Sequence, residues 1–125
     1  MSIILASVGV MLFSCGGTQS SAPLWKDEPV QFRLSVEDNG FTVSDSSLDW
    51  KLENGKFSKS TDDNALLTAA MKGNSRASFL AEMTRESEGR TINWQVTEAT
   101  SKDGRSTLQA EGNATCKTEK QVSAQ

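Results

Sequence analysis

The chain has 125 residues, a formal net charge of −3 at pH 7 and 36% hydrophobic residues, which suits a single globular domain. It contains no histidine, so it lacks the usual general base near neutral pH and the commonest metal ligand. Its 13 basic residues are interleaved with 16 acidic residues instead of forming a basic patch, which argues against a nucleic-acid partner. We expect no enzyme activity, no cofactor and no metal site.

An apolar run lies near the N-terminus. Residues 3–13 carry no charge, and every Lys, Arg, Asp and Glu lies after Cys15. A run of this length is too short for a transmembrane helix but is typical of the apolar segment of a secretory signal peptide. It also lacks the polar face that a surface helix of a globular domain would show. The sequence therefore predicts a signal peptide over residues 1–14.

The motif Leu12-Phe13-Ser14-Cys15 resembles a bacterial lipobox, with Leu at −3, a small residue at −1 and Cys as the first mature residue. The resemblance covers residues 1–15 only. It implies cleavage before Cys15 and a diacylglycerol on its sulfur, so that acyl chains such as palmitate anchor the protein in the cell envelope. Gly16 at position +2, instead of Asp, implies transfer to the outer membrane.

The second cysteine leaves an alternative open. If Cys15 carries a lipid, Cys116 is a single thiol, and its inward position in a predicted strand makes it a buried, reduced core residue. In an ordinary secreted protein, Cys15 and Cys116 would instead form a disulfide.

Small and polar residues follow the motif. Residues 15–28 include Pro23, and we interpret them as the lipidated N-terminus and a flexible linker. We expect a β domain over residues 29–118 and a C-terminal tail over residues 119–125.

The β domain starts with an alternating strand, whose apolar positions are Val30, Phe32, Leu34 and Val36. Alternation of this kind indicates a strand with one buried face. Asn39-Gly40 then predicts a two-residue hairpin turn, which would place Val36 opposite Val43.

The same pattern occurs a second time. Its apolar positions are Leu48, Trp50 and Leu52. Asn54-Gly55 follows and predicts a second hairpin, with Leu52 opposite Phe57.

The rest of the domain also favours strands. Residues 64–72 fit a helix or a strand equally well, whereas residues 75–85 favour a strand. A last hairpin turns at residues 101–104, with Val96 opposite Ala110. We therefore expect an all-β fold with at most one short helix, an antiparallel meander of seven or eight strands. It would form a small up-and-down barrel or a two-layer sandwich.

Few side chains suggest chemistry. The closest carboxylate pairs are Asp62-Asp63, which we expect to cap a turn, and Glu86 with Glu88, which we expect in a solvated loop. Trp50 and Trp94 could stack on a sugar or an apolar ligand, but their inward positions favour the core.

Three functions are consistent with these features. The first is a membrane-anchored, non-catalytic envelope lipoprotein that binds a protein or cell-wall partner through its surface. The second is a small β-barrel that carries an apolar ligand, and the third is a secreted, disulfide-bonded β domain. We favour the first, because a barrel of eight strands has an interior just wide enough for its own side chains.

Overall fold

The computed structural model describes residues 10–99 and 105–119, which form eight β-strands and no helix. The strands are β1 (Met11–Ser21), β2 (Glu28–Val36), β3 (Phe41–Ser44), β4 (Leu52–Lys59), β5 (Asn64–Met71), β6 (Asn74–Glu86), β7 (Gly89–Ala99) and β8 (Ser106–Thr118). They form one antiparallel sheet in the order β3-β2-β1-β8-β7-β6-β5-β4. The predicted all-β meander is confirmed.

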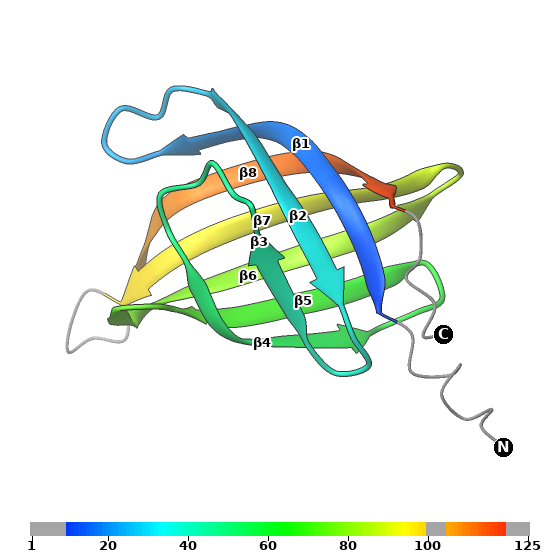
Figure 1. Cartoon of the computed structure of the whole chain (residues 1–125). Helices are drawn as coiled ribbons and strands as arrows, with labels where there is room; N and C mark the ends of the chain where they lie inside the picture. Colours follow the sequence, from blue (N-terminus) through cyan, green and yellow to red (C-terminus); the bar gives the residue numbers. More distant parts are fainter. Residues whose placement is uncertain (1–9, 100–104, 120–125) are drawn as a thin grey trace, which may run out of the picture.

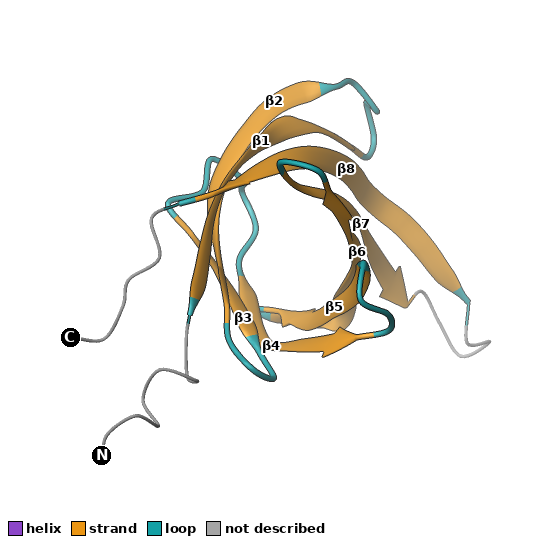
Figure 2. Ribbon diagram, turned by 90° about the vertical axis from the view of Figure 1, so that its right-hand side faces the viewer, coloured by secondary structure: helices purple, strands orange, loops and turns teal. Residues whose placement is uncertain are grey.

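The sheet curls into a nearly closed barrel, so the up-and-down barrel is the architecture (Figures 1 and 2). Its two edge strands, β3 and β4, meet at one point. Gly40 and Lys56 form an isolated bridge there, and the amide of Phe57 donates to the carbonyl oxygen of Asn39 at 3.1 Å. This contact brings the two edges of the sheet together at one point.

The hydrophobic core lies inside the barrel. Alternate side chains of each strand point inward, and these side chains form the core. The largest fully buried side chains are those of Trp94, Phe13, Leu34, Leu67, Ile92 and Cys116. Small inward residues of β6 and β8, such as Ala81 and Ala114, leave room for the aromatic rings. Side chains therefore fill most of the interior, apart from a small pocket of about 90 Å³ whose lining includes Phe13, Ala65 and Met83.

The predicted linker over residues 15–28 is wrong for most of its length. Residues 11–21 form β1, which lies in the sheet between β2 and β8. Its outward positions are polar because they face water, and its inward Gly17 has no side chain because β8 approaches closely there. These two requirements give the strand a composition like that of a linker. The β domain thus begins before residue 29, and only residues 22–27 connect β1 to β2.

The predicted signal peptide overlaps this strand. Residues 11–14 form the first part of β1, and Phe13 is a core residue. Residues 1–9 and 120–125 lie outside the described residues. Cleavage before Cys15 therefore stays a prediction, and it would remove Phe13 from the barrel.

The hairpin at Asn39-Gly40 is confirmed, but its register differs by two residues. Val36 pairs with Phe41, so the loop spans residues 37–40 and is closed by the amide of Glu37, which donates to the carbonyl oxygen of Gly40 at 2.8 Å. A shift of two leaves every side chain on its predicted face.

The hairpin at Asn54-Gly55 is wrong. β4 runs straight through these residues and pairs with β5, with a β-bulge between Glu53 and Lys56 and a φ of 56° at Asn54. A Cβ on Gly55 would meet the carbonyl oxygen of Phe41 in β3, so this glycine allows the barrel to close. A left-handed Asn before Gly serves a bulge as well as a turn, and the local sequence does not distinguish the two.

The remaining strands follow the expected parity. The ambiguous residues 64–72 contain strand β5, and the strand expected over residues 75–85 is the longer β6. Val96 pairs with Ala110 as predicted, but a bulge after Val96 shifts the rest of that hairpin. The turn at residues 101–104 lies outside the described residues.

Two adjacent glycines of β1 test this packing. An alanine at position 17 would bring its Cβ against the backbone of Asn113 and Ala114, whereas the nearest atom to a Cβ at position 16 is the carbonyl oxygen of Val30, at 3.9 Å. We expect Gly17→Ala to lower the free energy of unfolding by about 2 kcal/mol, as overpacking does. Gly16→Ala, the matched control, should change it by less than about 0.5 kcal/mol. Urea denaturation measures both, and equal values would contradict the close approach.

Candidate functional site

Cys15 and Cys116 lie directly opposite each other on β1 and β8 and form a disulfide, with their Cα atoms 4.1 Å apart. Both residues are buried in the core. The inward position predicted for Cys116 is confirmed. Its expected free thiol is wrong, because the described part of the chain contains no free cysteine. The physical reason is that β1, unrecognised in the sequence, brings Cys15 to the strand beside it.

The lipid predicted on Cys15 would use the same sulfur atom. A sulfur in a disulfide has no free valence for a thioether to diacylglycerol, so the two modifications exclude each other. Lipidation of Cys15 stays a prediction, for a form of the chain that lacks this disulfide. Among the described residues, no helix is long and apolar enough to cross a membrane.

A polar cluster lies inside the barrel, around Gln19. Gln19 is the one buried polar side chain among the described residues, and its Oε1 accepts hydrogen bonds from Nε1 of Trp94 at 2.9 Å and of Trp50 at 3.0 Å. The Trp94 ring packs edge-on against Phe32, with centroids 5.6 Å apart. Trp94 therefore belongs to the core, as predicted, whereas Trp50 is half-buried.

Both carboxylate pairs lie exposed at the ends of strands. Asp62 and Asp63 are exposed in the β4–β5 loop, where the Oγ1 atom of Thr61 accepts from the amide of Asp63 at 3.3 Å. Glu86 and Glu88 are exposed around the β6–β7 turn. Within residues 10–99 and 105–119, no three Cys, Asp or Glu side chains form a group that could hold a metal ion.

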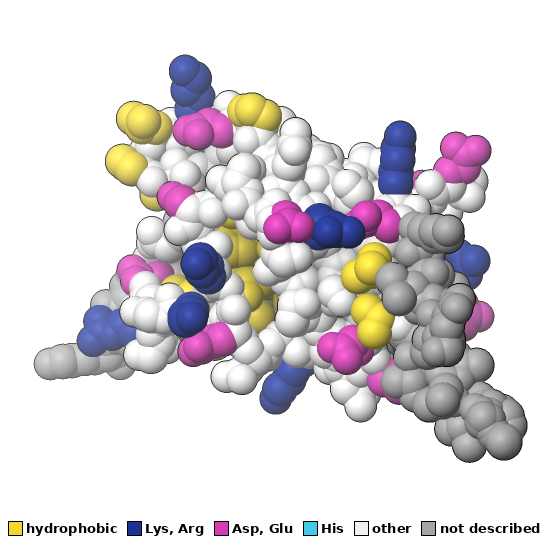
Figure 3. All heavy atoms as spheres, in the orientation of Figure 1, with side chains coloured by type: hydrophobic (Ala, Val, Ile, Leu, Met, Phe, Trp, Pro, Cys, Tyr) yellow, Lys and Arg dark blue, Asp and Glu magenta, His cyan; other side chains and the backbone are white. Residues whose placement is uncertain are grey.

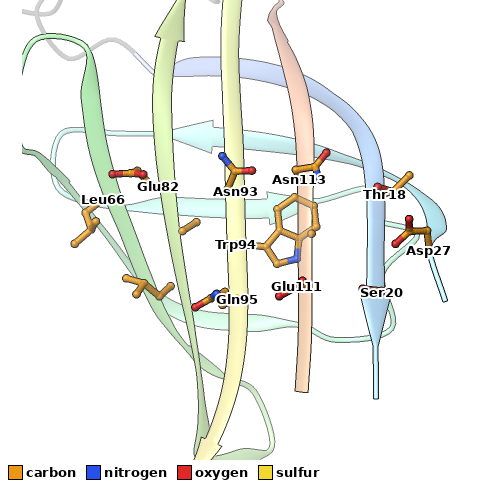
Figure 4. A pocket seen from close by; sticks show the side chains of 13 residues that line it. Thr18, Ser20, Asp27, Leu66, Glu82, Asn93, Trp94, Gln95, Glu111 and Asn113 are labelled. Atoms are coloured by element: carbon orange, nitrogen blue, oxygen red, sulfur yellow. The ribbon is translucent and has the colours of Figure 1, made fainter. Parts of the chain in front are cut away.

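A groove of about 530 Å³ runs over the outer face of the barrel (Figure 4). We call it the outer groove. It crosses β5, β6, β7, β8 and β1, and its polar and apolar side chains are Leu66, Leu80, Glu82, Asn93, Gln95, Glu111, Asn113, Thr18, Ser20 and Asp27. The groove is open to solvent, and its volume is in the range of ligand sites, about 300–1,000 Å³.

Strand pairing arranges these side chains in two rows across the sheet. The first row, in order, is Leu66, Glu82, Asn93, Asn113 and Thr18. The second, in order, is Leu80, Gln95, Glu111 and Ser20. Each row thus begins with a leucine, continues through carboxylate and amide groups, and ends with a hydroxyl. At a strand spacing of about 4.8 Å, the first row spans about 19 Å.

The outer groove is acidic. It has three carboxylates, Asp27, Glu82 and Glu111, while none of the described residues that line it is Lys or Arg. Its leucine end is apolar, since Leu66 and Leu80 are 41% and 47% exposed. The arrangement can attract positive charge along its length and bury an apolar side chain at one end.

The outer groove has no continuous motif in the sequence. Its residues occupy outward positions on five strands, and only the sheet order brings them together. The signal that could have found it is a pair of leucines, Leu66 and Leu80, at outward positions of strands whose other outward residues are mostly polar.

Comparison with known proteins adds no relative. No protein-family model, curated protein or solved structure matches this chain. The chemistry of the residues themselves is therefore the basis for a functional proposal.

Proposed function

We propose that this protein is a non-catalytic binding domain of the cell envelope, whose outer groove holds a basic segment of a partner protein. The observation that carries the proposal is the charge of the groove, which has three carboxylates and no basic residue among its described lining residues. Complementary charge of this kind steers a partner and fixes its orientation more than it adds affinity.

The rows support a peptide-like partner. Amide side chains such as Asn93, Asn113 and Gln95 can both donate and accept hydrogen bonds, as an extended peptide backbone requires. Basic side chains of the partner would meet Glu82 and Glu111, and an apolar side chain would lie against Leu66 and Leu80. A polar, open surface of this kind suits a transient contact with ordered water in it.

The disulfide supports a compartment outside the cytoplasm. Disulfides persist in oxidising environments and are rare in reducing ones. The Cys15–Cys116 bond is buried in the core, where it is part of the folded barrel. We therefore propose the secreted, disulfide-bonded form of the domain. The lipid-anchored form on Cys15 is the competing proposal, and mass spectrometry of the peptide that contains Cys15 separates the two, since it carries either Cys116 or a lipid.

Neutralising the outer groove is expected to weaken binding of a basic peptide. The probe is a synthetic peptide of alternating lysine and leucine residues. We expect Glu82→Gln/Glu111→Gln to weaken its binding about tenfold at low ionic strength, and rising salt should remove most of the difference. Isothermal titration calorimetry measures both effects.

A matched control distinguishes an effect of the groove carboxylates from an effect of the protein's net charge. Glu37→Gln/Asp38→Asn removes the same charge from the exposed β2–β3 loop, away from the groove. It should leave binding of the peptide within about twofold of wild type. Equal losses in the two double variants, or none in either, would contradict the proposed groove. Binding of soluble cell-wall glycan fragments in place of the peptide would change the class of partner.

A further inference from the structure

The barrel is closed at only one point between β3 and β4, and a recess lies along the rest of this seam. We call it the β3–β4 recess. Its volume is about 420 Å³, and its apolar walls are Val43, Leu48, Trp50 and Leu52. Figure 3 shows hydrophobic atoms exposed in a hollow near β3 and the segment that leads to β4, with basic side chains beside it.

Four of the nine residues that line the recess are apolar, and the other five are polar or charged. Of the five hydrophobic side chains that pack on the core but stay partly exposed, four line it, and the fifth is Phe57. Two of them, Leu48 and Trp50, belong to the segment over residues 45–51 and stay partly exposed to solvent. Partly exposed apolar side chains gathered in one concave place mark a binding site more often than single exposed ones do.

The walls of the recess are fixed in place. Nε1 of Trp50 donates to Gln19, and the Trp50 ring packs against Phe79 with centroids 5.5 Å apart. The backbone amide of Ser47 donates to the carbonyl oxygen of Gln31 at 2.9 Å, which ties the segment to β2. The recess is therefore formed before anything binds.

Two lysines stand at the rim. The amide of Lys72 donates to the carbonyl oxygen of Lys51 at 2.9 Å, so the two residues face each other just beyond the paired ends of β4 and β5. Both side chains are exposed and line the recess. Like charges directly opposite each other are destabilising. In the described part of the chain, neither ammonium group has a carboxylate within salt-bridge distance.

None of the nearby carboxylates among the described residues forms an ion pair with Lys51 or Lys72. Asp45, which also lines the recess, accepts from Nη1 of Arg33 at 3.3 Å, and Glu98 accepts from Asn74 at 2.8 Å. Hydrogen bonds to Glu119, and then to Asp45, raise the pKa of Arg33 above its ordinary value. Asp49 is exposed, and no ion pair joins it to either lysine. Both ammonium groups therefore stay available to contact an anion beside the apolar side chains.

We infer that the β3–β4 recess binds a single-chain amphiphile with an anionic head group, such as a fatty acid, which goes beyond the proposed function of the outer groove. The apolar chain lies against Leu48, Trp50 and Leu52, and the head group lies between Lys51 and Lys72. Removal of apolar surface from water supplies the affinity, and the like-charge pair of lysines supplies the preference for an anion. The site lies in the seam of the barrel, since side chains fill most of the interior.

Dodecanoate is the probe, used below its micelle concentration and titrated into the intact protein in a calorimeter. We expect saturable binding of one molecule per chain, and at least about tenfold weaker binding of dodecylamine, which has the same chain and the opposite charge. Lys51→Gln/Lys72→Gln should weaken dodecanoate binding about fivefold, as expected for two exposed charge contacts. Leu48→Asn should weaken it further by making the wall polar.

The matched control is Lys26→Gln/Lys117→Gln, which removes two exposed lysines that do not line the recess. It should leave dodecanoate affinity unchanged. Equal binding of dodecanoate and dodecylamine, or an equal loss in both lysine double variants, would overturn the inference, and so would the absence of saturable binding. Because every lysine substitution is at the surface, circular dichroism should show the same fold throughout. Dodecanoate binding in the recess and peptide binding in the outer groove are measured separately, so either proposal can fail without the other.

Discussion

Replacing Cys15 and Cys116 together by alanine should lower the free energy of unfolding by about 4 kcal/mol. The disulfide joins residues separated by 101 positions, so it constrains almost the whole unfolded chain. In the chain-entropy model, a loop of about 100 residues gives a stabilisation near 4.7 kcal/mol, and measured values are commonly somewhat smaller. Urea denaturation of the oxidised protein and of the double variant measures the difference.

Reductant supplies the control for this experiment. Dithiothreitol should shift the urea midpoint of the wild-type protein toward that of Cys15→Ala/Cys116→Ala and leave the double variant unaffected. Reduction should be slow without urea, because Cys15 and Cys116 are only 4% and 0% exposed. A wild-type protein insensitive to reductant, with a lipid on Cys15, would refute the disulfide and favour the lipoprotein.

The second large effect is expected at Gln19. Leucine has nearly the same size as glutamine but accepts no hydrogen bond, so Gln19→Leu leaves the indole N–H groups of Trp50 and Trp94 without their acceptor. A buried donor without a partner costs about 1–3 kcal/mol. Because Trp94 is fully buried and Trp50 is half-buried, we expect a total loss of about 3 kcal/mol by urea denaturation.

A double-mutant cycle tests whether the hydrogen bonds cause this loss. Trp50→Phe removes one donor together with part of a ring, and it should cost less in the Gln19→Leu background than in the wild type. The coupling between the two positions should be at least about 0.5 kcal/mol, which is the lower end for residues in one network. Additive effects would show that Gln19 acts through packing alone.

The fold class was predictable because strand parity is a local property. The alternation of Val30, Phe32, Leu34 and Val36 predicts the correct buried face even though the predicted register is wrong by two residues. A shift of two residues leaves each side chain on the same face of the sheet. Cys116 was placed inward for the same reason, as part of β8. Closure of the barrel was less accessible, because the bulge at Asn54-Gly55 depends on β3, a strand that is distant from it in the sheet order.

Strand β1 shows where local pattern fails. Its inward residues after Cys15 are Gly17 and Gln19, which give no apolar alternation. A side chain at position 17 would collide with the backbone of β8, so a glycine is needed there. Gln19 accepts hydrogen bonds from two tryptophans that lie far away in the sequence, so a polar residue is needed there. Only the folded partners explain these residues. For this reason the sequence alone leaves the disulfide as one of two alternatives. It also gives no continuous motif for the outer groove, which includes Thr18 and Ser20 of this strand.

The pairing of β1 with β8 also determines the order of events during biosynthesis. β1 leaves the ribosome before the other strands of the sheet, but it can pair with β8 only after synthesis has passed Ser106, where β8 begins. Until then β1 has one free edge and Cys15 has no partner, so the nascent chain has an unpaired strand that can associate with other chains. Contacts over such a sequence distance are slow to form. Termination or proteolysis anywhere before β8 would leave this state permanent, which makes the incomplete chain a natural substrate for chaperones and proteases of its compartment.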